Sequence, residues 1–180
     1  IQHALDLNDA LPFAIGQSGT IGIYNTLTLV EGLCTQGASV LLVAADKWLY
    51  PFFRAWGGLV VYGDGAAAML LDGRDANGWG RIQAYAVDYG EAIVNPWTLT
   101  PNDLADRLLP QTILAARTAL NNARIPPSGI DYLLPAGFST DFANRIGDAL
   151  DIAPARRMAR ARCHLSSADP LLALLQLRAS

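Results

Sequence analysis

The run VLLVAAD occupies residues 40–46 of this 180-residue chain. Its first six residues are all apolar, and the first charge comes only at Asp46. A continuous apolar run of this length is typical of a strand that is buried on both faces in a layered α/β protein. We therefore expect a sheet that is covered on both sides.

A polar turn and a helix precede this strand. Residues 11–15 (LPFAI) read as a short strand that runs into the turn GQSGT at residues 16–20. Apolar residues then recur at helical spacing, and Gly37 is the expected stop signal. The turn therefore lies at a helix N-terminus, where the helix dipole favours developing negative charge.

The sequence GDGAAA at residues 63–68 is expected to open a further strand. A dinucleotide-binding fingerprint must follow a strand and open a helix, so a nucleotide site has little support. The glycines are expected to permit a sharp bend and a close backbone approach. Turn residues at 72–80 mark the best boundary between two halves.

The second half alternates strand and helix signals. Strands or extended segments are expected at residues 81–89, 132–134 and 156–163. Helices are expected from Thr100, from Thr140 and from Ser166. Thr100 with Asp103, and Ser166 with Asp169, have the spacing of a capping box. Strands that alternate with helices indicate α/β layers.

The composition excludes several classes of protein. Thirteen Lys and Arg against sixteen Asp and Glu give a net charge of −3, which argues against a nucleic-acid partner. The 52% hydrophobic content excludes intrinsic disorder, and no run reaches the ~20 apolar residues of a membrane helix. Cys34 and Cys163 form neither a zinc knuckle nor a disulfide framework. Such cysteine usage suits a reducing cytoplasm. Nothing at the start of the chain reads as a secretory signal, and because it opens at Ile1 without an initiator methionine, we expect a fragment.

Three polar residues are the candidates for chemistry. His164 lies between an expected strand end and an expected helix start, with Asp169 five residues on. Spacing alone favours a helix-entry histidine, with Asp169 stabilising the helix N-terminus. Ser18 lies in the glycine-flanked turn, but serine is also an ordinary N-cap, and the turn lacks the last glycine of a Gly-x-Ser-x-Gly elbow. Together the three residues suggest acyl transfer, because a nucleophilic serine needs a base that a third group orients.

Four arginines lie within residues 156–162, near the C-terminal end of the sequence. Arg156, Arg160 and Arg162 fall on one face of the expected extended segment, with Arg157 opposite. The favoured interpretation is a solvated strand edge. The alternative is contact with the phosphates of coenzyme A or of a phosphopantetheine carrier.

The order of these motifs resembles the thiolase-fold condensing enzymes, specifically the ketoacyl-ACP synthase III class. Residues 63–68 are the most specific feature. The sequence IDYLLP at residues 130–135 resembles the strand before the family's catalytic histidine, and HLSSADP at 164–170 resembles the loop with its catalytic asparagine. The resemblance implies a partial thiolase-like layered αβαβα fold. Residues 1–73 would form the second part of the N-terminal lobe with the nucleophile elbow, and residues 74–180 most of the C-terminal lobe.

The site departs from that family pattern. The turn contains no cysteine; alignment from the following strand selects Ser18 as nucleophile, whereas alignment through the helix selects Thr20, and we favour Ser18. Ala136 stands where the histidine is expected, and His164 where the asparagine is expected. This set resembles the serine-dependent starter-unit acyltransferases of aromatic polyketide pathways, including the propionyl-priming type. The resemblance implies Ser18 as nucleophile, His164 as general base and Asp169 as its orienting carboxylate.

The resemblance also implies a function and partners. The expected enzyme is an acyltransferase of polyketide or fatty-acid biosynthesis. It would move a short acyl unit from acyl-CoA to an acyl carrier protein through an acyl-serine, as a homodimer and without a metal or resident cofactor. One alternative is a 3-oxoacyl-ACP synthase III-type decarboxylative condensing enzyme. The other is a catalytically inactive ketosynthase-like subunit.

Overall fold

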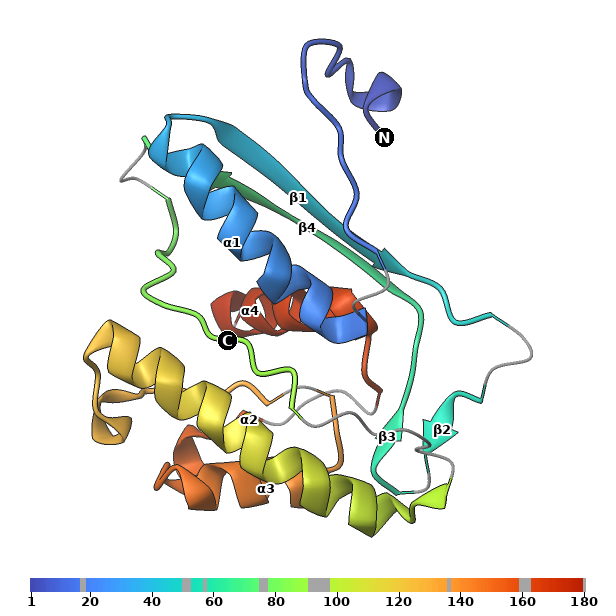
Figure 1. The fold of residues 1–180 in the computed structure, drawn as a ribbon, viewed down its shortest axis with the longest axis vertical. Coiled ribbons are helices and arrows are strands. Elements are labelled where there is room, and N and C mark those ends of the chain that lie inside the picture. Colours follow the sequence, from blue (N-terminus) through green and yellow to red (C-terminus); the bar gives the residue numbers. More distant parts are fainter. Residues whose placement is uncertain are drawn as a thin grey trace.

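The computed structural model describes residues 1–16, 19–49, 53–56, 58–74, 78–90, 98–135, 137–158 and 163–179. Figure 1 shows a long two-stranded ribbon, β1 and β4, that lies beside helices α1 and α4. Helices α2 and α3 form a second group with the short strands β2 and β3. None of the described helices is both long enough and apolar enough to cross a membrane.

The ribbon pairs β1 (Ser39–Asp46) with β4 (Gly65–Asp72) in antiparallel register, so that Leu41 lies opposite Leu70. Alternate side chains point to opposite faces of the ribbon. One face packs against α1 (Gly22–Thr35) and α4 (Asp169–Ala179). On the other face Leu41, Val43 and Leu70 are exposed, Leu70 by 68%. Within the described residues only one face of β1 is covered, so the expected cover on both faces is not seen in this part of the chain.

The helix expected after the polar turn is confirmed. A short 3-10 helix, η2 (Gly19–Ile21), leads into α1, and the helix ends at Thr35. Gly37 has a φ of 83°, which favours glycine and ends the helix as predicted. The strand expected at residues 11–15 does not form, because these residues pair with no strand in the described ranges and Leu11 is 87% exposed.

The second group is built on two helices. They are α2 (Pro101–Ala123) and α3 (Thr140–Ala149), and β2 (Ala55–Trp56) pairs with β3 (Val60–Val61) beside them. The predicted capping box at α2 is confirmed: the Thr100 hydroxyl accepts from the Asp103 N–H at 3.2 Å, and the Asp103 carboxylate accepts from the Thr100 N–H at 3.1 Å.

The segment at residues 81–89, for which the pattern predicts a strand, is not one. It lies along α1 through side-chain hydrogen bonds instead of a main-chain ladder. The Tyr85 hydroxyl donates to the Glu31 carboxylate at 2.8 Å, and the Tyr89 hydroxyl donates to the Asn25 side chain at 2.9 Å. An apolar pattern therefore marks a half-buried segment here, without a partner strand among the described residues.

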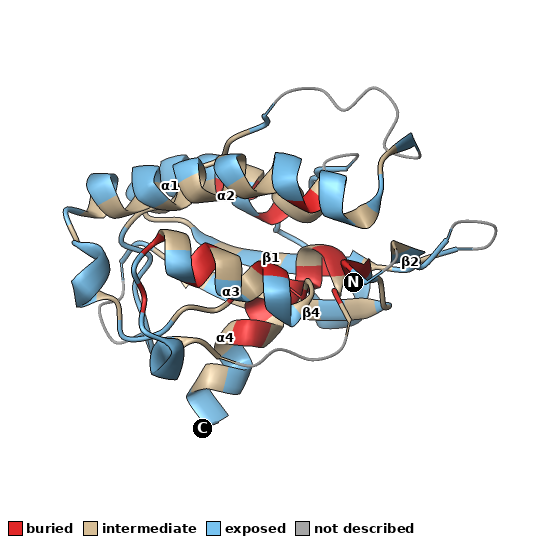
Figure 2. Ribbon diagram, turned by 90° about the horizontal axis from the view of Figure 1, so that it is seen from below, coloured by how far each residue is buried: buried red, intermediate tan, exposed pale blue. Residues whose placement is uncertain are grey.

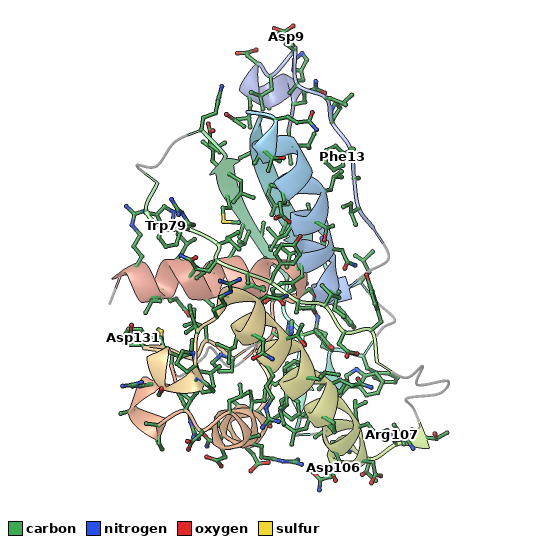
Figure 3. The ribbon with its side chains drawn as sticks, turned by 60° about the vertical axis from the view of Figure 1, so that its left-hand side comes forward. Asp9, Phe13, Trp79, Asp106, Arg107 and Asp131 are labelled. Atoms are coloured by element: carbon green, nitrogen blue, oxygen red, sulfur yellow. The ribbon has the colours of Figure 1, made fainter. Side chains whose placement is uncertain are left out.

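Helix α4 packs against β4. Its first half is buried, and it becomes exposed toward its C-terminal end (Figure 2). At that end the Arg178 guanidinium lies 5.6 Å from the centroid of Trp79, a residue that Figure 3 places beside the helix.

Two apolar clusters stabilise the molecule. Each contains residues from before and from after Gly73, where a boundary between two lobes is predicted. That boundary stays a prediction. One cluster packs Ala44 with Leu171, and the other packs Leu59 with Phe142. The two halves of the sequence therefore share their cores.

Candidate active site

The main chain of His164 is fixed beside β3 and β4. Its N–H donates to the Val61 carbonyl at 2.7 Å, and its carbonyl accepts from the Gly63 N–H at 3.0 Å. These bonds place His164 opposite Tyr62 in a parallel bridge. Side chains also pack closely on Gly63, where a β-carbon would lie 2.9 Å from the end of the Leu165 side chain and 3.1 Å from the Cys163 sulfur. The close approach expected of the glycines at 63–65 is confirmed.

The imidazole of His164 lies in an aromatic surrounding, and the residue is only 1% exposed. The ring of Tyr62 is 5.5 Å away between centroids, and the ring of Phe138 meets it edge-on at 5.2 Å. Tyr62 in turn stacks on Trp48 at 4.4 Å. Burial raises the pKa of the Tyr62 phenol. These rings limit the orientation of the imidazole.

The Nδ1 atom of His164 is a hydrogen-bond acceptor. The main-chain N–H of Ser166 donates to it at 2.9 Å. Ser166 is itself buried and has a φ of 50°, in the left-handed region that non-glycine residues rarely adopt. The chain thus turns sharply after His164 and directs an amide back at its ring.

Asp169 is buried beside this turn, at 1% exposure, as the first residue of α4. One carboxylate oxygen accepts from the Gly137 N–H at 2.9 Å, and the other accepts from the Leu165 N–H at 3.3 Å. The helix N-terminus also favours the negative charge. The predicted capping box with Ser166 does not form, because the carboxylate bonds to Leu165 and Gly137 instead.

A cavity of about 250 Å3 lies on the α1 side of Asp169. Tyr24, Leu134 and Leu171 contribute to its lining, which is mostly apolar. Burial raises the pKa of the Tyr24 phenol, and the charge of Asp169 raises it further. Asp169 therefore links the His164 turn to an apolar space beside α1.

Ser18, the predicted nucleophile, lies outside the described residues, but Gly16 and Gly19 on either side of it are placed. These two glycines line a cavity of about 160 Å3 together with Asp46 and Ser167. The Asp46 carboxylate accepts from the Ser167 N–H at 2.9 Å and from the Ser167 hydroxyl.

The 3-10 helix η2, which follows the predicted nucleophile Ser18, packs against the 3-10 helix η6 (Ser166–Ala168), which follows His164. The structure thus brings the borders of the polar turn to the His164–Asp169 segment. Thr20, the other nucleophile candidate, lies half-buried in η2. The roles of Ser18, His164 and Asp169 stay predictions.

Sequence reasoning missed the residues that surround His164. Tyr62 and Phe138 contact its ring, and Gly137 bonds to Asp169. Gly137 follows Ala136, which lies outside the described residues. The resemblance of residues 130–135 to a family strand and the place of Ala136 after it are the signals in the sequence that point to this loop.

The arginines that are described bind the protein's own main chain. Arg156 ends a 3-10 helix (Pro154–Arg156) and donates to the carbonyls of Ser128 and Ile130 at 3.0 and 2.9 Å. Its main-chain carbonyl accepts from the Leu133 N–H at 2.8 Å, and Leu133 lies opposite Arg157 in an isolated parallel bridge between the two segments that were expected to be extended. Arg160 and Arg162 lie outside the described residues.

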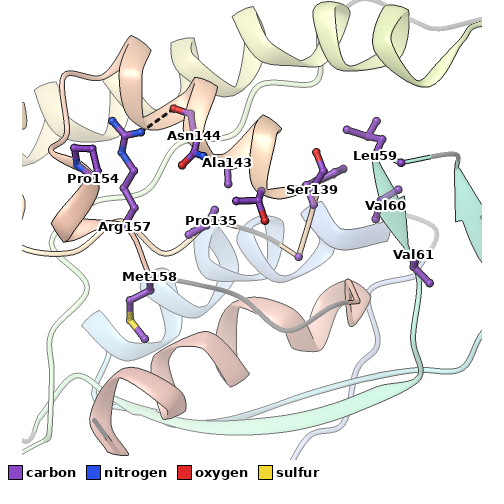
Figure 4. A pocket seen from close by; sticks show the side chains of 14 residues that line it. Leu59, Val60, Val61, Pro135, Ser139, Ala143, Asn144, Pro154, Arg157 and Met158 are labelled. Carbon is purple, nitrogen blue, oxygen red and sulfur yellow. Dashed lines mark hydrogen bonds between the residues drawn. The ribbon is translucent and has the colours of Figure 1, made fainter.

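Arg157 bonds to the end of α3. It donates to the Asn144 carbonyl at 3.2 Å, to the Ile152 carbonyl at 2.8 Å and to the Asp148 carboxylate at 2.8 Å. The side chain lines a third and larger cavity of about 390 Å3 (Figure 4). Phe138 lines the same cavity, and its ring also meets the imidazole of His164 edge-on. Within the described ranges, no three His, Cys, Asp or Glu side chains are grouped to hold a metal ion.

Comparison with known proteins finds similar structures but no matching family model or curated sequence. No protein-family model and no curated protein sequence matches the chain. Solved structures do match. The acyltransferase ChlB3 has a TM-score of 0.75 and 25% identity over 98% of this chain. The 3-oxoacyl-(acyl carrier protein) synthase III FabH from Pseudomonas aeruginosa PAO1 has a TM-score of 0.77 and 24% identity over 99%. The synthase III from Aquifex aeolicus VF5 has a TM-score of 0.74 and 16% identity over 99%.

These matches confirm the predicted fold class. The chain has the thiolase-type α/β fold of the synthase III structures. It contains only part of that fold, since it spans 61% of the length of each of these three solved chains. The described strands and helices agree with a mixed helix-and-sheet architecture.

Proposed function

We propose that this chain forms the acyl-transfer site of a synthase III-like acyltransferase, with Ser18 as the residue that carries the acyl group. The observation that supports it most is the packing of η2, which follows Ser18, against η6, which follows His164. Two segments from opposite ends of the sequence meet there beside a buried histidine and a buried aspartate. The likeness to ChlB3, whose name states an acyltransferase, gives further support.

The proposed substrate is a short acyl-CoA, and the proposed acceptor is the thiol of an acyl carrier protein. The 390 Å3 cavity reaches Phe138 beside His164, and Leu59 and Val60 give its lining an apolar part. An elongated, mostly uncharged thioester arm fits such a lining. Ser18, His164 and Asp169 are the three proposed site residues, and a cytoplasmic homodimer without a resident cofactor is part of the same proposal.

Trapping the acyl-enzyme tests this function. The protein is incubated with propionyl-CoA or acetyl-CoA, and intact mass and peptide mapping locate the adduct. We expect one acyl increment on Ser18, none in Ser18→Ala, and an unchanged increment in Thr20→Ala. An adduct that maps to Thr20, or no adduct at all, would contradict the proposal.

A condensing enzyme is the second candidate, because two of the matched structures bear the name 3-oxoacyl-ACP synthase III. It differs in that the bound acyl group is extended with a malonyl partner. Only condensation releases carbon dioxide from a malonyl-carrier protein, so product analysis separates the two activities. The third possibility, an inactive subunit, predicts that Ser18→Ala leaves the output of the pathway unchanged.

A further inference from the structure

We propose that the cavity of about 250 Å3 beside α1 binds a small, uncharged and mostly apolar molecule that carries one hydrogen-bond acceptor oxygen. A ketone, an ester or an acyl group has this chemistry. Such a site does not require the proposed acyl-transfer function, because the lining of the cavity alone defines its ligand.

The wall of this cavity is mostly apolar and comes from four parts of the chain. Helices α1 and α4 pack on the same face of the β1–β4 ribbon, and the segment at residues 81–89 lies along α1 (Figure 1). Together they contribute these apolar side chains: Ile23, Leu27, Met69, Ile82, Leu171 and Leu174. An apolar cavity of roughly 150 Å3 already accommodates a ligand the size of benzene. The larger cavity here therefore has room for a six-membered ring with a short substituent.

Of the described residues that line the cavity, three have polar side chains, and two of these are already paired. The Tyr85 hydroxyl donates to the Glu31 carboxylate at 2.8 Å, and both oxygens of Asp169 accept main-chain amides. The Tyr24 hydroxyl makes no hydrogen bond with any described residue. It is therefore the side-chain group on this lining that is available to a ligand.

Tyr24 is suited to donate that hydrogen bond. Burial first, and the charge of Asp169 second, raise the pKa of its phenol, so the hydroxyl keeps its proton at neutral pH. The residue is 37% exposed, so a molecule from solvent can reach its ring. A ligand with an acceptor oxygen would bond to the hydroxyl, whereas a ligand without one would leave this donor unsatisfied in an apolar space.

The carboxylate of Asp169 determines the charge that the cavity accepts. Asp169 is 1% exposed and belongs to the lining. A second negative charge would be repelled, because an apolar surrounding screens charges weakly. The same repulsion already disfavours the phenolate of Tyr24. The cavity therefore favours an uncharged ligand over a carboxylate of the same size.

The two methionines of the chain report on two different cavities. Met69 lines the proposed site, whereas Met158 lines the 390 Å3 cavity. Labelling with 13C-methyl methionine therefore gives two NMR signals, which Met158→Leu assigns. The probe is acetophenone, a six-membered ring with a short ketone. We expect it to shift the Met69 signal to saturation and to leave the Met158 signal unchanged. A shift of Met158 alone, or of neither signal, would overturn the proposal.

Matched probes test the chemistry of the ligand. Ethylbenzene has a similar size but no oxygen, and benzoate carries a negative charge at neutral pH. Tyr24→Phe should weaken acetophenone binding about two- to tenfold, as for one lost hydrogen bond, and should leave ethylbenzene binding unchanged. Benzoate should not shift the Met69 signal. Benzoate binding as tight as that of acetophenone, or an equal effect of Tyr24→Phe on both uncharged probes, would contradict the assigned ligand class.

A bulky side chain in the wall should block the cavity. Leu174 belongs to the lining, whereas its neighbour Leu175 is 46% exposed and does not. Leu174→Trp should abolish the Met69 shift, and the matched control Leu175→Trp should keep it. Equal binding by both variants would count against the site. If Leu174→Trp does not fold, the two methionine signals of the wild-type protein still decide which cavity takes the probe.

Two sources could supply a molecule of this class: a free ligand, or the acyl group of the proposed acyl-enzyme. Propionyl-CoA separates them. A Met69 shift in the wild-type protein that is absent in Ser18→Ala assigns the cavity to the acyl group, and no shift in either protein assigns it to a free ligand. Acetophenone should bind both proteins. If the wild-type protein forms no acyl-enzyme, the proposed function fails, and the acetophenone titration still tests the site.

Discussion

Gly137 lies against the main chain of His164. A β-carbon on Gly137 would come within 2.7 Å of the His164 Cα and 2.6 Å of the Cys163 carbonyl oxygen, both of which are main-chain atoms. The N–H of the same glycine donates to the Asp169 carboxylate. The loop before α3 therefore meets the His164 turn through a contact that only glycine allows.

Gly137→Ala should destabilise the protein and disturb the site. A main chain that cannot move aside makes the added methyl group cost about 1–3 kcal/mol in the free energy of unfolding. Urea unfolding measures this loss, and acyl-enzyme formation measures the shift of His164. The matched control is Gly80→Ala, since nothing lies within 4 Å of a β-carbon there. Equal stability of the two variants would contradict the close contact.

Asp169→Asn should destabilise the protein more than an exposed Asp→Asn change does. The amide keeps one acceptor oxygen, but its NH2 group would face either the Gly137 N–H or the Leu165 N–H. A buried donor left unsatisfied costs about 1–3 kcal/mol, which urea unfolding detects. Asp131→Asn, at an exposed position that Figure 3 labels, is the control and should change stability by less than ~0.5 kcal/mol. The hypothesis of a buried anchoring carboxylate is wrong if both variants unfold alike.

The helices could be predicted because their signals are local. Thr100 and Asp103 are three residues apart and form the capping box in the structure. Gly37 ends α1 because its own φ is positive. The strands predicted at residues 11–15 and 81–89 are absent, since an apolar pattern reports burial and carries no information about a partner strand.

The surroundings of His164 could not be predicted in the same way. Tyr62, Phe138 and Ser166 reach its ring from three separate segments. The hydrogen bond from Ser166 depends on a left-handed φ at a serine, for which the sequence has no signal. Glycine would have given one, as it does at Gly37.

Tyr24 should make the protein sensitive to alkaline pH. Burial first, and the Asp169 charge second, raise the pKa of this phenol above its ordinary value of 10.0 in the folded state. As the pH rises past about 10 the unfolded chain ionises first, so this contribution to stability is present at lower pH and is lost as the pH rises through the folded pKa.

Urea unfolding at a neutral pH and at a pH just above 10.0, the ordinary pKa of a tyrosine, checks this effect. Tyr24→Phe removes the ionisable group, so the variant should lose less stability than the wild-type protein between the two pH values. Tyr132→Phe, at a tyrosine that is 56% exposed against 37% for Tyr24, serves as the control and should follow the wild type. Identical losses in Tyr24→Phe and wild type would show that Tyr24 is not the group responsible.

The two faces of the β1–β4 ribbon should respond differently to truncation. Leu42 packs against the cluster of Ile23, Ala44 and Leu171, whereas Leu70 points from the other face and is 68% exposed. Leu42→Ala should lower the free energy of unfolding by about 2 kcal/mol or more, because it removes packed methyl groups. Leu70→Ala should change it by less than ~0.5 kcal/mol, because its side chain is already in water. Urea unfolding of both variants at two protein concentrations checks this difference. A loss at Leu70 as large as at Leu42, and larger at the higher concentration, would mean that a second copy of the chain covers this face.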